Sequence, residues 1–169
     1  MQEIILLSIG AAAILLLCSK KKKVVKMADI TTSVPNSAGT NRGLKNNNVG
    51  NIRTSADKFK GEIQPSSDKA FKQFKTREYG IRAIFVILDT YSKKYNLNTI
   101  EGIISRYAPK KDGNNTDVYI EHVETWTGIP RTKTITSDND KMKLVKAIIR
   151  QETSYIATDS ELKNAYNLI

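Results

Sequence analysis

The chain has 169 residues, of which 40% are apolar and 26% charged, and its formal net charge is +10 at pH 7. This length fits one domain of ordinary size with an appendage, and the apolar fraction is enough for a packed core. The single cysteine, Cys18, and the single histidine, His122, exclude internal disulfides, cysteine metal clusters and histidine-rich metal sites. We therefore expect no cofactor, and any metal would have oxygen ligands alone.

The first expected element is an apolar helix at the N-terminus. Residues 4–18 carry no charge, and residues 1–18 as a helix would be about 27 Å long, close to the thickness of about 30 Å of a bilayer's hydrocarbon core. Lysines occupy positions 20–23, so the pattern predicts a membrane anchor with a basic flank over residues 1–26, with the following residues in the cytoplasm. A cleaved signal peptide and a partner-binding helix are the alternatives, although a signal peptide normally has its positive charge before the apolar stretch.

Residues 27–41 have no helical or strand periodicity and are rich in Ser, Thr, Asn, Pro and Gly. They are expected to form a flexible linker, which leaves residues 42–169 as the folded domain. Within that domain, residues 42–82 hold ten Lys or Arg against four acids. Such a stretch attracts a polyanion, either nucleic acid or an anionic cell envelope, and the alternative is a solvated basic surface.

The domain is expected to be mostly α-helical with one small β-hairpin. Two short alternating runs flank residues 64–67, which is typical of a hairpin. The helices that periodicity and capping residues predict are 77–95 after Thr76, 99–107, 116–128, 139–152 after Asp138, and 160–169 after Asp159. Gly80 inside the first of these is expected to mark a close packing contact.

The fourth predicted helix places one acid among apolar residues. Met142, Val145, Ile148 and Ile149 lie on one side of the helical wheel, and Glu152 falls in the middle of that arc. Burial and the negative end of the helix dipole both raise the pKa of a carboxyl there, toward the value that a general acid needs near neutral pH. The alternatives are a frayed helix end with Glu152 in water, or an ion pair with Arg53 or Arg106.

Several segments, taken together, resemble a known family. "RGLKNNNVGNIR" at 42–53, "REYGIRAIFVILDTY" at 77–91, "LNTIEGIISRYAP" at 97–109, "NNTDVYIEHV" at 114–123 and "KAIIRQE" at 146–152 follow one another in the chain. Their order and spacing over residues 42–155 are similar to those of lysozyme-like bacteriophage virion proteins and transglycosylases.

The resemblance implies an α+β lysozyme-like fold, circularly permuted relative to common lysozymes, in which Glu152 is the catalytic acid. It implies that Asn47, Asn48 and Asn51 lie beside Glu152, where their amides can face a sugar. Tyr107, Tyr119 and Tyr155 are further candidates for the cleft wall, although core packing is the more common role of such tyrosines. The expected partner is the glycan strand of peptidoglycan, and the expected location is a virion membrane or the host inner membrane, crossed once through residues 4–18. Other virion proteins are further expected partners, and nucleic acid is a weaker one.

Two departures from the family pattern put activity in doubt. Val49 stands where the family has proline, and Thr153 and Ser154 replace the Asn-Gly that caps the catalytic helix. A lytic transglycosylase needs a single acid, whereas a hydrolase normally needs two carboxylates, and Asp57, Glu62 and Asp68 are available near the asparagine loop. The alternative function is a non-catalytic virion structural protein that links membrane to capsid or binds glycan or nucleic acid.

Overall fold

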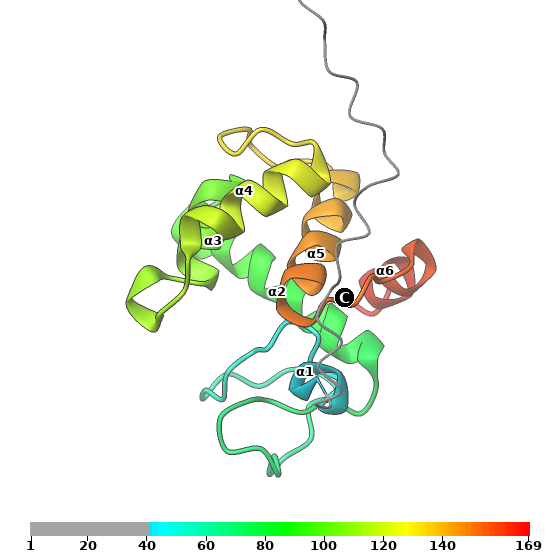
Figure 1. Cartoon of the computed structure of the whole chain (residues 1–169). Coiled ribbons are helices and arrows are strands. Elements are labelled where there is room, and N and C mark those ends of the chain that lie inside the picture. The colour runs from blue at the N-terminus through cyan, green and yellow to red at the C-terminus, as the bar shows by residue number, and fades with distance from the viewer. Residues whose placement is uncertain (1–40) are drawn as a thin grey trace, which may run out of the picture. The chain divides into compact units, whose positions relative to one another are not determined.

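The computed structural model describes residues 41–169, which are mostly helical (Figure 1). A short helix opens this part of the chain, a long irregular segment follows it, and the remaining helices come in close succession. The helices are α1 (Arg42–Lys45), α2 (Arg77–Tyr95), α3 (Ile100–Tyr107), a 3-10 turn η1 (Lys110–Asp112), α4 (Thr116–Thr127), α5 (Asp138–Thr153) and α6 (Asp159–Tyr166).

The five longer helices lie where the sequence predicts them, but two begin with a different capping residue. The side chain of Ser137 accepts from the amide of Asp140 at the start of α5. Thr158 forms a capping box with Glu161 at the start of α6. The expected caps, Asp138 and Asp159, are instead the first helical residues, where their negative charge favours the helix N-terminus.

The core surrounds α5, which packs against α4, α6, α2 and α1. Leu144, Val145, Ile148 and Ile149 are fully buried on this helix, and burial of each such side chain stabilises the fold by about 1.5–3 kcal/mol. The last turn of α5 leaves this core and meets the irregular segment that follows α1 (Figure 1). The helix therefore connects the hydrophobic core to the asparagine-rich segment.

Gly80 marks the expected close contact between α2 and the asparagine-rich segment. A Cβ atom on Gly80 would lie 1.9 Å from the backbone oxygen of Asn47, far inside van der Waals contact. Only glycine lets the two backbones approach this closely. The N-terminal half of α2 thus holds the loop at residues 46–51 in place.

The expected β-hairpin around residues 64–67 is wrong. Residues 41–169 contain isolated antiparallel bridges, Arg53 with Phe71, Glu62 with Phe74 and Thr99 with Thr134, and no continuous ladder. The reason is that residues 71–75 bond in turn to three neighbouring segments, at Ile52, Asn46 and residues 61–63. The amide of Lys72 donates to Ile52 O, whereas the amide of Lys75 donates to Gly61 O, so neither pairing extends into a strand.

The expected fold class is corrected accordingly. No helix within residues 41–169 is long and apolar enough to cross a membrane, and isolated bridges replace the β part of the expected α+β fold. The segments predicted to form the transmembrane anchor, 1–26, and nearly all of the linker, 27–41, lie outside the described residues. The described domain is a helical one in which a long irregular segment takes the place of the hairpin.

Candidate functional site

The asparagine-rich segment folds into a tight loop that its own side chains hold together. The Asn41 side chain caps α1 by accepting from the amides of Gly43 and Leu44. Asn47 and Asn51 adopt positive φ angles of 51° and 45°, a conformation that asparagine tolerates better than most residues. The repeated asparagines therefore supply both the cap and the two left-handed residues that turn the chain.

Asn47 and Asn48 use their amides for the loop itself. The Asn48 side chain is fully buried; its amide nitrogen donates to Ile52 O and Lys72 O, and its oxygen accepts from the amide of Ile52. The Asn47 amide donates to Phe74 O. Because these hydrogen bonds use their amide groups, both side chains stabilise the loop. Neither lines the pocket described below. The hydrogen bonds give both residues a structural role in the loop, and their expected contact with a sugar stays a prediction.

The last turn of α5 ends against this loop. Ser154 takes the left-handed conformation, with φ of 56°, and its amide donates to Arg150 O. The helix thus ends with the geometry of a glycine cap although serine stands in that position. The Asn41 side chain also donates to Thr153 O over 2.7 Å, which ties α1 to the end of α5.

Glu152 lies in that last turn and contacts two of the residues predicted for the site. The Asn51 amide donates to the Glu152 carboxylate oxygen Oε2 and to the Glu152 backbone oxygen, each over 3.0 Å. The Tyr119 hydroxyl donates to Oε1, also over 3.0 Å. Both carboxylate oxygens therefore have a neutral donor, and none of the ion pairs among residues 41–169 involves Glu152.

Burial raises the pKa of the Glu152 carboxyl above its ordinary value. The hydrogen bonds from Asn51 and Tyr119, and the positive charge of Arg53, act in the opposite direction without cancelling the effect of burial. Burial and the nearby Glu152 charge also raise the pKa of Tyr107 and Tyr119 well above the usual value, so both hydroxyls keep their protons at neutral pH. The site thus combines a carboxyl that holds its proton more tightly than usual with two neutral phenols.

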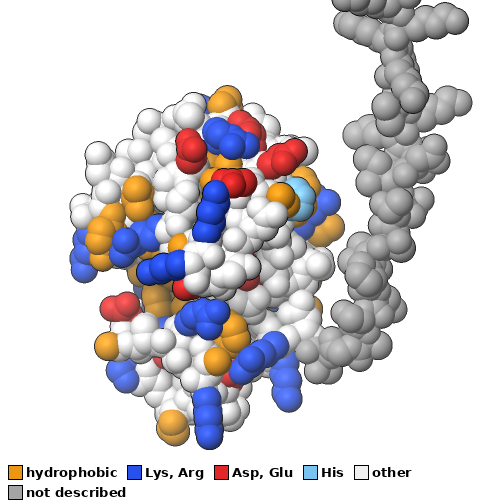
Figure 2. All heavy atoms as spheres, turned by 60° about the vertical axis from the view of Figure 1, so that its left-hand side comes forward, with side chains coloured by type: hydrophobic (Ala, Val, Ile, Leu, Met, Phe, Trp, Pro, Cys, Tyr) orange, Lys and Arg blue, Asp and Glu red, His pale blue; other side chains and the backbone are white. Residues whose placement is uncertain are grey.

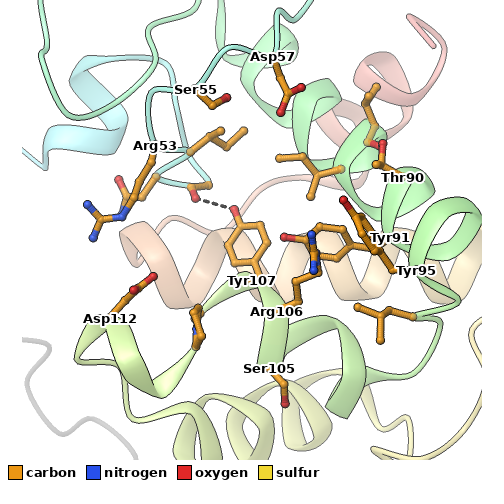
Figure 3. Close-up of a pocket in the computed structure, with 18 of the residues that line it drawn as sticks. Arg53, Ser55, Asp57, Thr90, Tyr91, Tyr95, Ser105, Arg106, Tyr107 and Asp112 are labelled. Atoms are coloured by element: carbon orange, nitrogen blue, oxygen red, sulfur yellow. Dashed lines mark hydrogen bonds between the residues drawn. The ribbon is translucent and has the colours of Figure 1, made fainter.

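Glu152 opens onto a pocket of about 1120 Å³. The wall of this pocket comes from the loop at residues 50–59, the C-terminal half of α2, α3 and the segment 108–114. Tyr107 stands at its centre and donates to Gly50 O over 2.5 Å (Figure 3). This volume is slightly above the range of about 300–1,000 Å³ usual for small-molecule sites, so the pocket has room for more than one sugar ring.

Of the three acids expected near the asparagine loop, one lines the pocket. Glu62 forms a buried ion pair with Lys72 over 3.0 Å. Asp68 pairs with Arg42 and accepts from the amides of Ala70 and Phe71, and the Arg42 contact holds the pKa of Asp68 well below its usual range. Asp57 is the one of these three acids that lines the pocket (Figure 3).

Tyr107 lines the pocket, whereas Tyr119 and Tyr155 do not. Tyr119 contacts the site through its hydrogen bond to Glu152, and Tyr155 lies apart from both. The Tyr155 hydroxyl accepts from Arg77 and donates to Glu161 over 2.6 Å, so it joins the start of α2 to the start of α6. Tyr155 therefore does not line this pocket, and its expected contact with a substrate stays a prediction. The structure brings together Glu152, Asn51, Tyr107 and Tyr119 of the predicted site.

Four residues of the pocket wall, Arg53, Tyr91, Tyr95 and Arg106, were not predicted to line it. The two arginines were expected only as possible ion-pair partners of Glu152. Tyr91 and Tyr95 are four residues apart on α2, a spacing that places two rings on one helix face. That spacing was the available signal, but it is equally typical of core packing.

Two comparisons with known proteins bear on this site. No family model matches the sequence. Over 129 residues the chain is 41% identical to "Protein P5" of Pseudoalteromonas phage PM2, an alignment that covers 74% of this chain and 79% of that protein.

Proposed function

The chain belongs to the family of Protein P5 of Pseudoalteromonas phage PM2, and we propose that it is a phage virion protein that cleaves the glycan strands of peptidoglycan, with Glu152 as the acid. The phage relationship rests on the sequence identity. The proposed chemistry rests on the pocket and on the resemblance of residues 42–155 to lysozyme-like phage proteins.

The observation that carries the proposal is the setting of Glu152. A partly buried carboxyl opens onto a large pocket, and burial raises its pKa. Asn51 and Tyr119 fix both of its oxygens by hydrogen bonds. A proton donor that is held in one orientation beside a groove is what general-acid cleavage of a glycosidic bond requires.

The proposed reaction needs one acid. Glu152 gives its proton to the glycosidic oxygen, and the bond between that oxygen and the anomeric carbon breaks. The C6 hydroxyl of the same sugar then attacks the anomeric carbon, and its proton passes to the Glu152 carboxylate, which restores the acid. The product is an anhydro sugar, as in a lytic transglycosylase. A hydrolase would add water instead, with a second carboxylate as base or nucleophile.

The test is cleavage of purified murein by the full chain, in a gel assay and by chromatography of the soluble products. Glu152→Gln keeps the shape of the side chain and removes the proton donor, so we expect a loss of activity of about 10²- to 10⁴-fold. Glu121→Gln is the matched control, because Glu121 is exposed on α4 and does not line the pocket. Undiminished cleavage by the Glu152→Gln variant contradicts the assignment of the acid.

A second candidate is a non-catalytic virion structural protein that binds glycan through the same pocket. The relationship to a phage protein whose name states no enzymatic activity supports it, as does the departure from the family pattern at Thr153 and Ser154. This candidate predicts that the wild-type chain binds murein without cleaving it. The gel assay combined with a murein pull-down therefore separates the two.

A further inference from the structure

One wall of the pocket carries an arginine that rests on two tyrosine rings. The guanidinium carbon of Arg106 lies 3.6 Å from the centre of the Tyr95 ring and 5.3 Å from the centre of the Tyr91 ring. Figure 3 shows Arg106 between Tyr107 and this tyrosine pair. Stacking on aromatic faces orients a guanidinium and leaves the N–H groups at its edge available to a ligand.

Arg106 has no acidic partner within the described residues. The ion pairs of residues 41–169 engage other arginines and lysines, and none includes Arg106. The tyrosine rings are neutral, so they hold its position without balancing its charge. An oriented and unbalanced guanidinium in a pocket wall is suited to bind a carboxylate through two parallel hydrogen bonds.

The rest of the pocket is also richer in positive than in negative charge. Beside Glu152 the lining acids are Asp57 and Asp112. The lining cations are Arg53, Lys58, Lys94, Arg106 and Lys111. Figure 2 shows lysine and arginine side chains across the middle and lower part of one face of the molecule, whereas most of the acidic side chains visible there lie near its top. Such a pocket attracts an anionic ligand more strongly than a neutral one.

We propose that the pocket selects an anionic glycan, a strand of amino sugars whose substituents bear carboxylates, and that Arg106 binds one of these carboxylates. The inference rests on the proposed function for the cleavage chemistry and adds the residue that recognises the acidic substituents of that substrate. It makes Arg106 a specificity residue: a neutral polymer of the same sugars lacks the group that the guanidinium binds.

Binding to the full-length Glu152→Gln chain tests this inference, because that variant leaves the ligand intact. The probes are a soluble peptide-bearing muramyl oligosaccharide and the same preparation after its carboxylates have been amidated. We expect at least about tenfold weaker binding after amidation, which corresponds to the loss of one charged contact. Adding Arg106→Gln is expected to remove this preference, and Arg106→Lys to restore part of it, because lysine keeps the charge but not the planar fork.

Arg150→Gln is the control for the arginine change. Arg150 also stacks on an aromatic ring, at 4.1 Å from Trp126, but it does not line the pocket. A preference for the anionic probe that Arg150→Gln leaves unchanged and Arg106→Gln abolishes supports the inference. Equal affinity for the two probes, or a preference that survives Arg106→Gln in a variant with unchanged thermal stability, overturns it.

Murein cleavage by the wild-type chain, measured in parallel, keeps the two proposals apart. Cleavage that depends on Glu152 and is accompanied by equal binding of both probes retains the enzyme and removes the role of Arg106. A preference that depends on Arg106 without any cleavage retains the anionic site and removes the enzyme.

Discussion

The Asn51 side-chain amide donates to the backbone oxygen and to the carboxylate of Glu152, each over 3.0 Å, across 101 positions of the sequence. One amide thus fixes both the end of α5 and the orientation of its carboxyl. The asparagine-rich loop and the last turn of α5 are thus joined at the Glu152 carboxyl, the proposed acid.

The raised pKa of Glu152 predicts how activity and stability vary with pH. A general acid must be protonated, so murein cleavage is expected to fall as pH rises through the folded-state pKa. Because that pKa lies above its unfolded value, the carboxyl contributes stability at low pH that is lost as pH rises from the unfolded value of about 4.3 through the folded one. Glu152→Gln is therefore expected to be more stable than wild type at pH 7.

Chemical denaturation at pH 7 and at pH 4 measures this effect. The gain from Glu152→Gln should shrink at pH 4, where the wild-type carboxyl is protonated in both states. A gain of the same size at both pH values would mean that the side chain acts through packing rather than through its charge.

Asn51 is expected to position Glu152 and to hold its pKa down. Asn51→Gly keeps the positive φ angle accessible and removes the amide. The loss of a hydrogen bond to the carboxylate raises the pKa of Glu152 further, so the fall of activity on the alkaline side should move to higher pH, with about a tenfold or greater loss of the maximal rate.

Asn47→Gly is the matched control for Asn51→Gly, since Asn47 also has a positive φ angle but bonds to Phe74 O instead of the carboxyl. It should lower stability without moving the pH profile. Identical pH profiles for wild type and Asn51→Gly would contradict the positioning role.

Gly80→Ala is expected to be strongly destabilising. Its methyl group would meet the backbone oxygen of Asn47 at 1.9 Å, and neither backbone can move without displacing the loop, so a loss of about 1–3 kcal/mol or more is expected. Gly102→Ala, where the nearest atom is a Leu97 methyl at 3.2 Å, should be tolerated. Thermal melting of the two variants checks this, and equal melting temperatures would contradict the close contact.

The buried pair of Lys72 and Glu62 is expected to stabilise the pocket wall at Asp57. The Lys72 ammonium group donates to the Glu62 carboxylate over 3.0 Å and to Asp57 O over 2.6 Å, and both side chains are almost fully buried. Lys72→Met leaves the Glu62 carboxylate buried without its partner, which costs about 3–5 kcal/mol. The double variant with Glu62→Leu should recover much of this in urea denaturation. A double variant as unstable as the single one would show that the backbone contacts of Lys72 matter more than the pair.

Asp57 decides between the two routes of cleavage. If the enzyme uses a single acid, Asp57→Asn should keep the anhydro product and most of the rate. If Asp57 is the second carboxylate, the variant should lose hydrolysis by about 10²-fold or more. Mass spectrometry of the soluble murein fragments separates the products, with Asp159→Asn, an exposed acid on α6, as control. We expect the anhydro product to persist, and its disappearance would favour the hydrolase.

The helices of this domain could be predicted from the sequence because their apolar faces and caps are local signals. The predicted range 77–95 is that of α2. The predicted caps of α5 and α6 were one residue late, because Ser137 and Thr158 each precede an aspartate that is itself a good capping residue. The proximity of Glu152 to Asn51 followed from helical periodicity together with a family resemblance. Neither signal alone fixes a contact between residues so far apart in the chain.

The irregular segment at residues 46–76 could not be predicted in the same way. Its order depends on side chains that bond to distant backbone, such as Asn48 to Lys72 O and Lys72 to Asp57 O. An asparagine that binds a sugar and one that supports a turn have the same local pattern. The sequence therefore could not distinguish Asn51, which contacts Glu152, from Asn47 and Asn48, which support the loop.

The bond from the Asn41 side chain to Thr153 O joins the first described residue to the turn that carries Glu152. Mechanical load applied to the chain ahead of Asn41 would reach that turn before it reached the core, whereas load applied at Ile169 would pass through α6. Residues 154–158 connect α6 directly to the same turn, so load from either end of the described chain converges on the turn that carries Glu152.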